Sequence, residues 1–236
     1  MRATDDWVKS FLASPIEHEP GSVFLYNSAG SFMLSAIVQK ATGETMIDYL
    51  QPRLFEPLGI EGADWEVNPQ GINVGGWGLR VKTEDMAKLG LLYLQNGRWG
   101  DRQILSEEWV GAATSKQINT VEGAADPESD WAQCYGYQFW QTTNNAFRGD
   151  GAFGQFIIVL PEKDAVVAMT ANVQDMQQEI NLVWEHLLPA FQESPLPEDD
   201  AALDALNARL EMLTLPTYVI GTFSTIEEEI SGKTIS

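Results

Sequence analysis

The chain has 236 residues, of which 44% are hydrophobic, and its 34 acidic and 14 basic residues give a formal net charge of −20. That hydrophobic content is typical of a folded protein, whereas so acidic a surface repels nucleic-acid phosphates and anionic membranes, so we expect neither as a partner. One cysteine, Cys134, excludes an internal disulfide, and the two histidines have no partner at metal-ligand spacing, so we expect no metal or other cofactor.

Helical patterns dominate the first part of the chain. Thr4-Asp5-Asp6 stand before a short apolar run that Pro15 ends, which predicts a capped amphipathic helix. A second helix is expected to begin near Ser28 and to end at Gly43, and a third to span Thr45 to Phe55. The apolar stretch 23–38 is interrupted by polar residues and is too short to span a membrane, so we expect a soluble chain.

A glycine-rich stretch and two more helices follow. Residues 68–79 include four glycines, which predicts a loop that closely approaches another part of the molecule. Thr83 is expected to cap a helix that ends at Asn96-Gly97, and Ser106 to cap the next helix. Lys82-Thr83-Glu84 is similar to a lysine-threonine-glycine strand motif. Because it lies at the start of a helix, we interpret it as a helix cap.

After a polar linker over 119–130, the pattern changes to that of strands. Tyr135–Gln141, Ala152–Leu160 and Ala165–Thr170 are rich in β-branched and aromatic residues, and Pro161 to Asp164 form a turn sequence that predicts an antiparallel hairpin. A helix over Asp175–Phe191 is expected to cover one face of this sheet. Helices followed by strands and a covering helix predict an α+β fold, with a separate helical layer from Ser28 to Ser115.

This order also predicts three regions. Residues 1–130 form a mainly helical region, and residues 131–192 form the antiparallel sheet and its covering helix. Residues 193–236 are expected to contain a linker, a helix over Ala201–Leu213 and part of an appended segment.

Three stretches, in this order and spacing, carry a resemblance to a known family. They are PGSVFLYNSAGSFMLSAIVQKATGETMIDYLQPRLFEPLGI from Pro20, GGWGLRVKTEDMAKLGLLYLQNGRWGDRQILSEEW from Gly75 and GDGAFGQFIIVLPEKDAVVAMTAN from Gly149. Together they resemble the class C β-lactamase-like and penicillin-binding-protein-like serine hydrolases, which include carboxylesterases and D-alanyl-D-alanine peptidases. The resemblance runs from about Trp7 to Phe191. It implies the β-lactamase/transpeptidase fold and acyl-enzyme chemistry on a small ester, amide or lactam.

The resemblance assigns roles to Tyr26-Asn27-Ser28, which match the Y-x-N loop of that family. It implies that Tyr26 takes part in proton transfer and that Ser28 stands where asparagine is usual, while Asn27 is a neighbouring substrate-binding residue. A serine makes a hydrogen bond over a shorter reach than an amide does. Without the resemblance, Tyr26 would be interpreted as an aromatic staple ahead of a helix.

Asp150, Gly151, Ala152 and Phe153 occupy the place of the family's substrate-binding edge strand. The small residues let a substrate lie against the strand, and the backbone N–H near Phe153 is expected to be an oxyanion donor. Asp150 replaces a usual cation, which argues against substrates that carry a carboxylate and favours a neutral ester or amide. The alternative interpretation is a β-bulge with a turn aspartate.

The family's nucleophile motif, S-x-x-K, is absent from the sequence, because no serine is followed by lysine three residues later. We therefore expect an N-terminally truncated hydrolase; the alternative is a non-catalytic binding or scaffold module that retains the family cleft. Missing strands would expose a sheet edge and apolar surface near Ile180, Val183 and Leu187. Such a surface favours self-association, exchange of a terminal element with a copy, or cover by residues 201–236, and of these we expect self-association.

Overall fold

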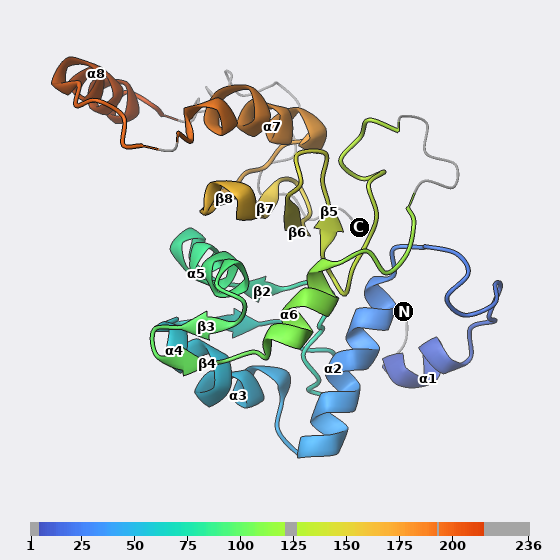
Figure 1. Ribbon diagram of the computed structural model, residues 1–236. Helices are drawn as coiled ribbons and strands as arrows, with labels where there is room; N and C mark the ends of the chain where they lie inside the picture. Colours follow the sequence, from blue (N-terminus) through green and yellow to red (C-terminus); the bar gives the residue numbers. More distant parts are fainter. Residues whose placement is uncertain (1–4, 121–126, 193, 215–236) are drawn as a thin grey trace, which may run out of the picture. The chain divides into compact units, whose positions relative to one another are not determined.

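The computed structural model describes residues 5–120, 127–192 and 194–214, and contacts divide the chain into two units, Met1–Phe191 and Gln192–Ser236 (Figure 1). In the first unit, α1 (Trp7–Leu12) starts after Asp6, whose carboxylate accepts a hydrogen bond from the Lys9 N–H. The predicted first helix is confirmed for the described residues, and Thr4 lies outside them.

The next two helices also follow the sequence pattern. α2 (Ser28–Thr42) ends at Gly43, whose φ of 77° is a left-handed conformation that glycine adopts at low cost. The Thr45 hydroxyl caps α3 (Met46–Leu50), which continues through one π-helical turn, η1 (Gln51–Phe55), into α4 (Glu56–Leu58). Both predicted helices are confirmed.

Of the two caps predicted for α5 (Thr83–Leu94) and α6 (Glu107–Thr114), the structure contains only that of α6. The Ser106 hydroxyl accepts a hydrogen bond from the Trp109 N–H at 3.1 Å, so the predicted cap of α6 is confirmed. The predicted cap at Thr83 is wrong: Thr83 is the first helical residue, and its side chain makes no capping hydrogen bond. Its hydroxyl lies instead 3.2 Å from that of Thr170 at the end of a strand.

Two small antiparallel ribbons interrupt this helical region, and the sequence pattern did not predict them. The strands β1 (Asp64–Trp65) and β2 (Leu79–Arg80) pair with each other, as do β3 (Arg98–Trp99) and β4 (Arg102–Gln103). Each strand has two residues, which is too short to show an alternating apolar pattern.

The glycine-rich loop packs closely on α2, as predicted. A Cβ atom placed on Gly75 would lie 2.7 Å from the Ser31 carbonyl oxygen, and one placed on Gly76 would lie 2.6 Å from that of Ser28. Only glycine permits this approach at both positions. The loop therefore lies against the first turns of the helix that follows Tyr26.

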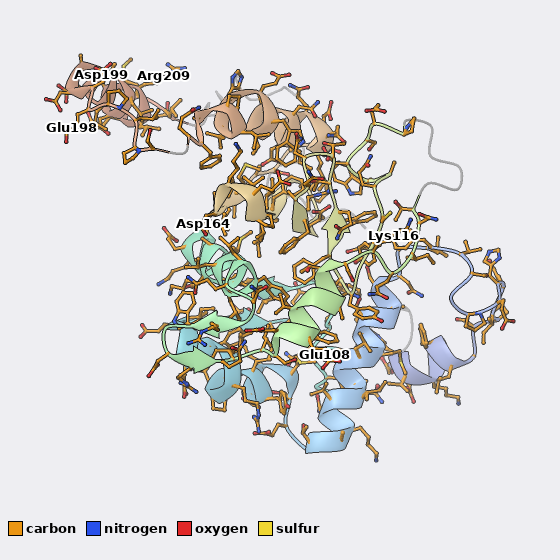
Figure 2. The ribbon with its side chains drawn as sticks, in the orientation of Figure 1. Glu108, Lys116, Asp164, Glu198, Asp199 and Arg209 are labelled. Atoms are coloured by element: carbon orange, nitrogen blue, oxygen red, sulfur yellow. The ribbon has the colours of Figure 1, made fainter. Side chains whose placement is uncertain are left out.

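The main sheet contains four antiparallel strands in the order β5-β6-β7-β8. They are β5 (Trp140–Gln141), β6 (Phe147–Gly151), β7 (Gln155–Leu160) and β8 (Ala165–Thr170). The predicted hairpin is confirmed by the pairing of β7 with β8 from Gln155↔Thr170 to Leu160↔Ala165. In Figure 2 the label of Asp164 marks the turn of this hairpin.

Two predicted strand boundaries are wrong. Tyr135–Gln141 is a strand only at its last two residues, because Gln138 has a φ of 69°, which an extended strand does not contain. The strand predicted from Ala152 begins at Gln155, because Phe153 and Gly154 have φ values of 66° and 96° and form a turn. β6, which precedes this turn, was predicted only as the place of the Asp150 motif.

Both faces of the sheet are covered, and α7 (Met176–Leu182) and α5 lie on opposite sides of it (Figure 1). After α7 the helix continues through η3 (Val183–Leu187) and η4 (Leu188–Ala190). Phe156 and Ile158 pack against Ile180 and Val183, so the predicted covering helix is confirmed. The predicted exposure of Ile180 and Val183 is wrong, because both are buried by the sheet, whereas Leu187 is exposed.

The C-terminal unit contains α8 (Asp200–Glu211), which begins after Asp199 and has no buried residue among those described. In Figure 2 the labels of Asp199 and Arg209 mark this helix. The predicted helix over 201–213 is confirmed apart from its bounds, and the appended segment beyond residue 214 lies outside the described residues. No helix within the described ranges combines the length and apolar character needed to cross a membrane.

Candidate active site

Tyr26 belongs to a cluster of aromatic rings at the start of α2. Its ring stacks on that of Trp140, with centroids 6.0 Å apart and planes at 14°, and meets the edge of Tyr135 at 6.4 Å. Phe24 contacts both of these partners. Tyr26 remains half exposed, so the cluster holds the ring and leaves part of it open to a ligand.

Asn27 and Ser28 form the first turn of α2. The Asn27 side-chain oxygen accepts a hydrogen bond from the Gly30 N–H at 3.0 Å, so this oxygen caps the helix. The Nδ2 group of Asn27 and the second lone pair of this oxygen can still contact a substrate. Ser28 lies against Gly76, so it is next to the glycine-rich loop.

Asp150 forms an ion pair with Arg148 on the same face of the sheet. Arg148 Nε lies 2.9 Å from Asp150 Oδ1, and Arg148 Nη2 donates to Asp150 Oδ2 at 3.2 Å. The side chain of Arg148 is fully buried, and that of Asp150 is 8% exposed. Asp150 pairs with Phe156 in a regular register, so the alternative interpretation as a β-bulge is wrong.

Arg148 is held by more than its carboxylate partner. Its Nη1 donates to the backbone oxygens of Asp130 and Gln141 at 3.0 and 3.2 Å, and its guanidinium lies 4.5 Å from the ring centroid of Trp131. Burial lowers the pKa of Arg148, although the charge of Asp150 opposes this shift. Burial raises the pKa of Asp150 to about 6, because the loss of water disfavours its charged form more than the attraction of Arg148 favours it.

The charge of Asp150 also acts on the tyrosines. Burial and then the Asp150 charge raise the pKa of Tyr26. Burial, Tyr26 and Asp150 together raise the pKa of Tyr135. Tyr26 stacks on Trp140, which pairs with Arg148, the partner of Asp150, so the two motifs lie near each other, and both tyrosines stay protonated at neutral pH.

Asp130 is a residue of this region that the sequence did not reveal. Its carboxylate accepts hydrogen bonds from the backbone and hydroxyl of Thr143, from Gln177 and from Trp184, at 2.7–3.0 Å. Burial raises its pKa, but these bonds and the charge of Arg148 outweigh burial and lower it. In the sequence Asp130 stands at the end of a polar linker, and no pattern distinguishes it from its neighbours.

The predicted residues Gly151, Ala152 and Phe153 lie at the turn between β6 and β7. The Phe153 side chain is half exposed, and its carbonyl accepts a hydrogen bond from the Val173 N–H at 3.0 Å. Gly154 follows, and a Cβ atom on it would lie 2.0 Å from Glu179 Oε2. The turn thus presents small or exposed groups next to the strand that carries Asp150.

The described residues contain no group of three or more His, Cys, Asp or Glu side chains arranged to hold a metal ion. An open hollow of the surface is lined by residues of α1 and by Gln70, and none of the predicted site residues borders it. The candidate site is therefore the surface around Tyr26, Asp150 and the β6–β7 turn.

A four-stranded antiparallel sheet with α5 and α7 on its two faces is the arrangement of the β-lactamase and penicillin-binding fold. The Beta-lactamase family matches residues 1–188. The chain belongs to this family.

Known relatives agree with this assignment. The 6-aminohexanoate-dimer hydrolase of Paenarthrobacter ureafaciens is 28% identical over 160 residues, which are 64% of this chain and 40% of that protein. A putative 6-aminohexanoate-dimer hydrolase from Bacillus anthracis has a similar structure, with a TM-score of 0.65 and 24% identity over 78% of this chain and 47% of that one. An octameric penicillin-binding protein homologue from Pyrococcus abyssi has a TM-score of 0.56 and 23% identity, over 73% of this chain and 44% of its own. The chain thus spans less than half the length of these relatives.

Proposed function

We propose that this chain supplies the tyrosine loop and the substrate-binding strand of a serine hydrolase that acts through an acyl-enzyme on a small neutral amide or ester. The nucleophile would come from sequence outside this chain, since none of its serines is followed by lysine three residues later. The observation that carries the proposal is that Tyr26 stacks on Trp140, which pairs with Arg148, the ion-pair partner of Asp150, so residues of the two motifs lie close together.

In this proposal Tyr26 exchanges a proton with the leaving group or the nucleophile. The Tyr26 hydroxyl is protonated before reaction, and a nearby cation such as the lysine of the S-x-x-K motif would lower its pKa toward the working range. Ser28 and the Nδ2 group of Asn27 hydrogen-bond the substrate from the start of α2. The small side chain of Ala152 leaves room for the substrate at the end of β6, next to Gly151, and the Phe153 N–H donates to the substrate carbonyl oxygen.

The charge of the site favours a neutral substrate. Arg148 is buried and paired with Asp150, so it is not available to a substrate carboxylate. Two similar proteins are named 6-aminohexanoate-dimer hydrolases; the link in such a dimer is an amide, which favours an amide over a lactam, and its terminal carboxylate would need a partner other than Arg148.

A fusion experiment tests the proposal. The S-x-x-K segment of a family hydrolase is joined ahead of this chain, and a fluorophosphonate probe and p-nitrophenyl esters are applied. We expect labelling and turnover by the fusion and neither by the chain alone. Tyr26→Phe in the fusion should lower turnover by about 10²–10⁴-fold. Tyr137→Phe, which alters an exposed tyrosine outside the Tyr26 stack, should leave turnover unchanged.

Ester hydrolysis by the isolated chain that survives both Tyr26→Phe and Ser28→Ala would place the chemistry elsewhere. The second candidate function is a non-catalytic binding module, which the absent S-x-x-K motif favours. It predicts that the fusion stays unlabelled while the chain alone binds a small amide or ester.

A further inference from the structure

We propose that Gln155 is a positioning residue whose side-chain amide holds the Ala152–Phe153 peptide so that the Phe153 N–H faces a bound substrate. This inference rests on the proposed function, because it concerns the donor that stabilises the negative oxygen in acyl transfer. Gln155 is not among the residues that the sequence motifs single out. Its contacts across the β6–β7 turn assign the role.

The turn that carries the donor is tight and conformationally unfavourable. Gly151 pairs with Gln155, so three residues, Ala152, Phe153 and Gly154, connect the two strands. Phe153 has a φ of 66°, a left-handed conformation that side chains other than glycine rarely adopt. Such a conformation persists only where surrounding contacts maintain it.

Gln155 provides contacts of this kind. Its Nε2 atom donates to the Ala171 carbonyl oxygen at 2.5 Å and to the Ala152 carbonyl oxygen at 3.4 Å. An amide nitrogen carries two hydrogens, so one side chain serves both acceptors. The bond to Ala171 holds the Gln155 side chain against the segment after β8. The bond to Ala152 connects the same side chain to the turn.

Fixing the Ala152 carbonyl also fixes the Phe153 N–H. The two groups belong to one planar trans peptide and point in opposite directions. The next peptide is held in the same way, because the Phe153 carbonyl accepts a hydrogen bond from the Val173 N–H at 3.0 Å. Within the described ranges no hydrogen bond involves the Phe153 N–H, so this donor is free for a ligand.

The test replaces Gln155 by methionine, which has a similar length and no donor. The probe is 4-nitrophenylacetone, a ketone that resembles p-nitrophenyl acetate and cannot be hydrolysed. The Phe153 amide signal of the full chain is followed by ¹H–¹⁵N NMR during titration. In the wild type we expect the Phe153 signal to move when the ketone is added. Gln155→Met should shift this signal even without the ketone. It should also weaken binding of the ketone about fivefold, the effect of losing one hydrogen bond, that between the Phe153 N–H and the ketone oxygen.

Gln117→Met is the matched control, because the Gln117 amide also donates to a backbone carbonyl, that of Ala112 at 2.9 Å, away from the turn. It should change neither the Phe153 signal nor the affinity. A Gln155→Met variant with the wild-type Phe153 signal and affinity would overturn the inference. If methionine prevents folding, Gln155→Glu, which keeps the size and removes the donor, is judged by the same two readouts.

The two proposals fail in different ways. If Gln155→Met shifts the free Phe153 signal but the ketone moves no signal of this turn in the wild type, the peptide is positioned as proposed and the donor role in the proposed function is wrong. If the ketone moves the Phe153 signal equally in both proteins, the donor role stands and the role of Gln155 is wrong.

Discussion

Arg148 and Asp150 lie two residues apart on β6 and are buried on one face of the sheet. Their attraction is opposed by the loss of water from both charges, and the raised pKa of Asp150 shows that loss of water has the larger effect. The pair is therefore weak evidence for stability. It does remove the free cation that would bind a substrate carboxylate.

A pH dependence follows from the same residue. The pKa of Asp150 is about 6 in the folded protein and has its ordinary value of 3.8 in the unfolded chain. Because the folded state binds this proton more tightly, ionisation of Asp150 opposes folding. The free energy of unfolding should therefore fall between about pH 4 and pH 6, by roughly 1–3 kcal/mol from this group. Urea unfolding across this range measures it.

The matched comparison uses Asp150→Asn and Asp164→Asn. The Asp150→Asn variant should lose this part of the slope, since it has no proton to release. Asp164 is exposed at the β7–β8 turn, so its variant should keep the wild-type slope. Equal slopes in the wild type and Asp150→Asn would contradict the expectation.

At the scale of elements, the contact between α5 and the sheet depends on Gly90. A Cβ atom on Gly90 would lie 2.5 Å from Val166 Cγ1 and 2.8 Å from Ile157 Cγ2. The helix therefore packs with its backbone close to β7 and β8. A side chain at this position would force the helix and the sheet apart.

Gly90→Ala is accordingly expected to lower the free energy of unfolding by about 1–3 kcal/mol, as other overpacked cores do. Gly111→Ala is the control in α6, where an added Cβ atom meets nothing within 4 Å. That variant should gain about 0.5–1 kcal/mol from helix propensity. Thermal unfolding followed by circular dichroism compares the two, and a loss of equal size in both would show that packing at Gly90 is not the cause.

The elements differ in how well the sequence predicts them, for physical reasons. Helices with a capping residue and a terminal glycine, such as α2, are local structures, and their signals are local too. The β7–β8 hairpin is similar, since its turn sequence lies between two apolar runs. The segment 135–141 could not be predicted correctly, because its bend at Gln138 depends on contacts such as the Tyr137 N–H bond to the Ala113 carbonyl.

At the scale of the whole molecule, apolar surface remains on the outer side of α2. Leu34 and Ile37 are both more than half exposed and lie three residues apart on that helix. β5 pairs only with Phe147 and Arg148, so within the described ranges residues 149–151 of β6 have no strand on that side. An open edge and an apolar helix face together favour association.

We therefore expect the isolated chain to self-associate, with a mass that rises with concentration above the 26.2 kDa of one chain in light scattering. Lysine at both Leu34 and Ile37 should shift the protein toward the single-chain mass. Val67→Lys, which also alters an exposed apolar residue, is the control. A single-chain mass at every concentration would contradict the expectation.

The sequence predicted the class of site better than its electrostatics. Tyr26 and the Asp150 motif are predicted as site residues by resemblance, because each lies within a continuous stretch. Asp150 and Arg148 are only two residues apart in the sequence. The burial of their ion pair, however, depends on Trp131, Trp140 and the covering helix. The contacts of Asp130 and Gln155 exist only in the folded chain.

The burial of Arg148 also has a consequence for the order of events in folding. Its partners come from the end of the linker, from β5 and from β6, so they meet only after the sheet has closed. Until then the guanidinium keeps its water, and its dehydration is an uphill step that late contacts must offset. We expect the β7–β8 hairpin to form early and the surroundings of Tyr26, which stacks on Trp140 of β5, to be completed last.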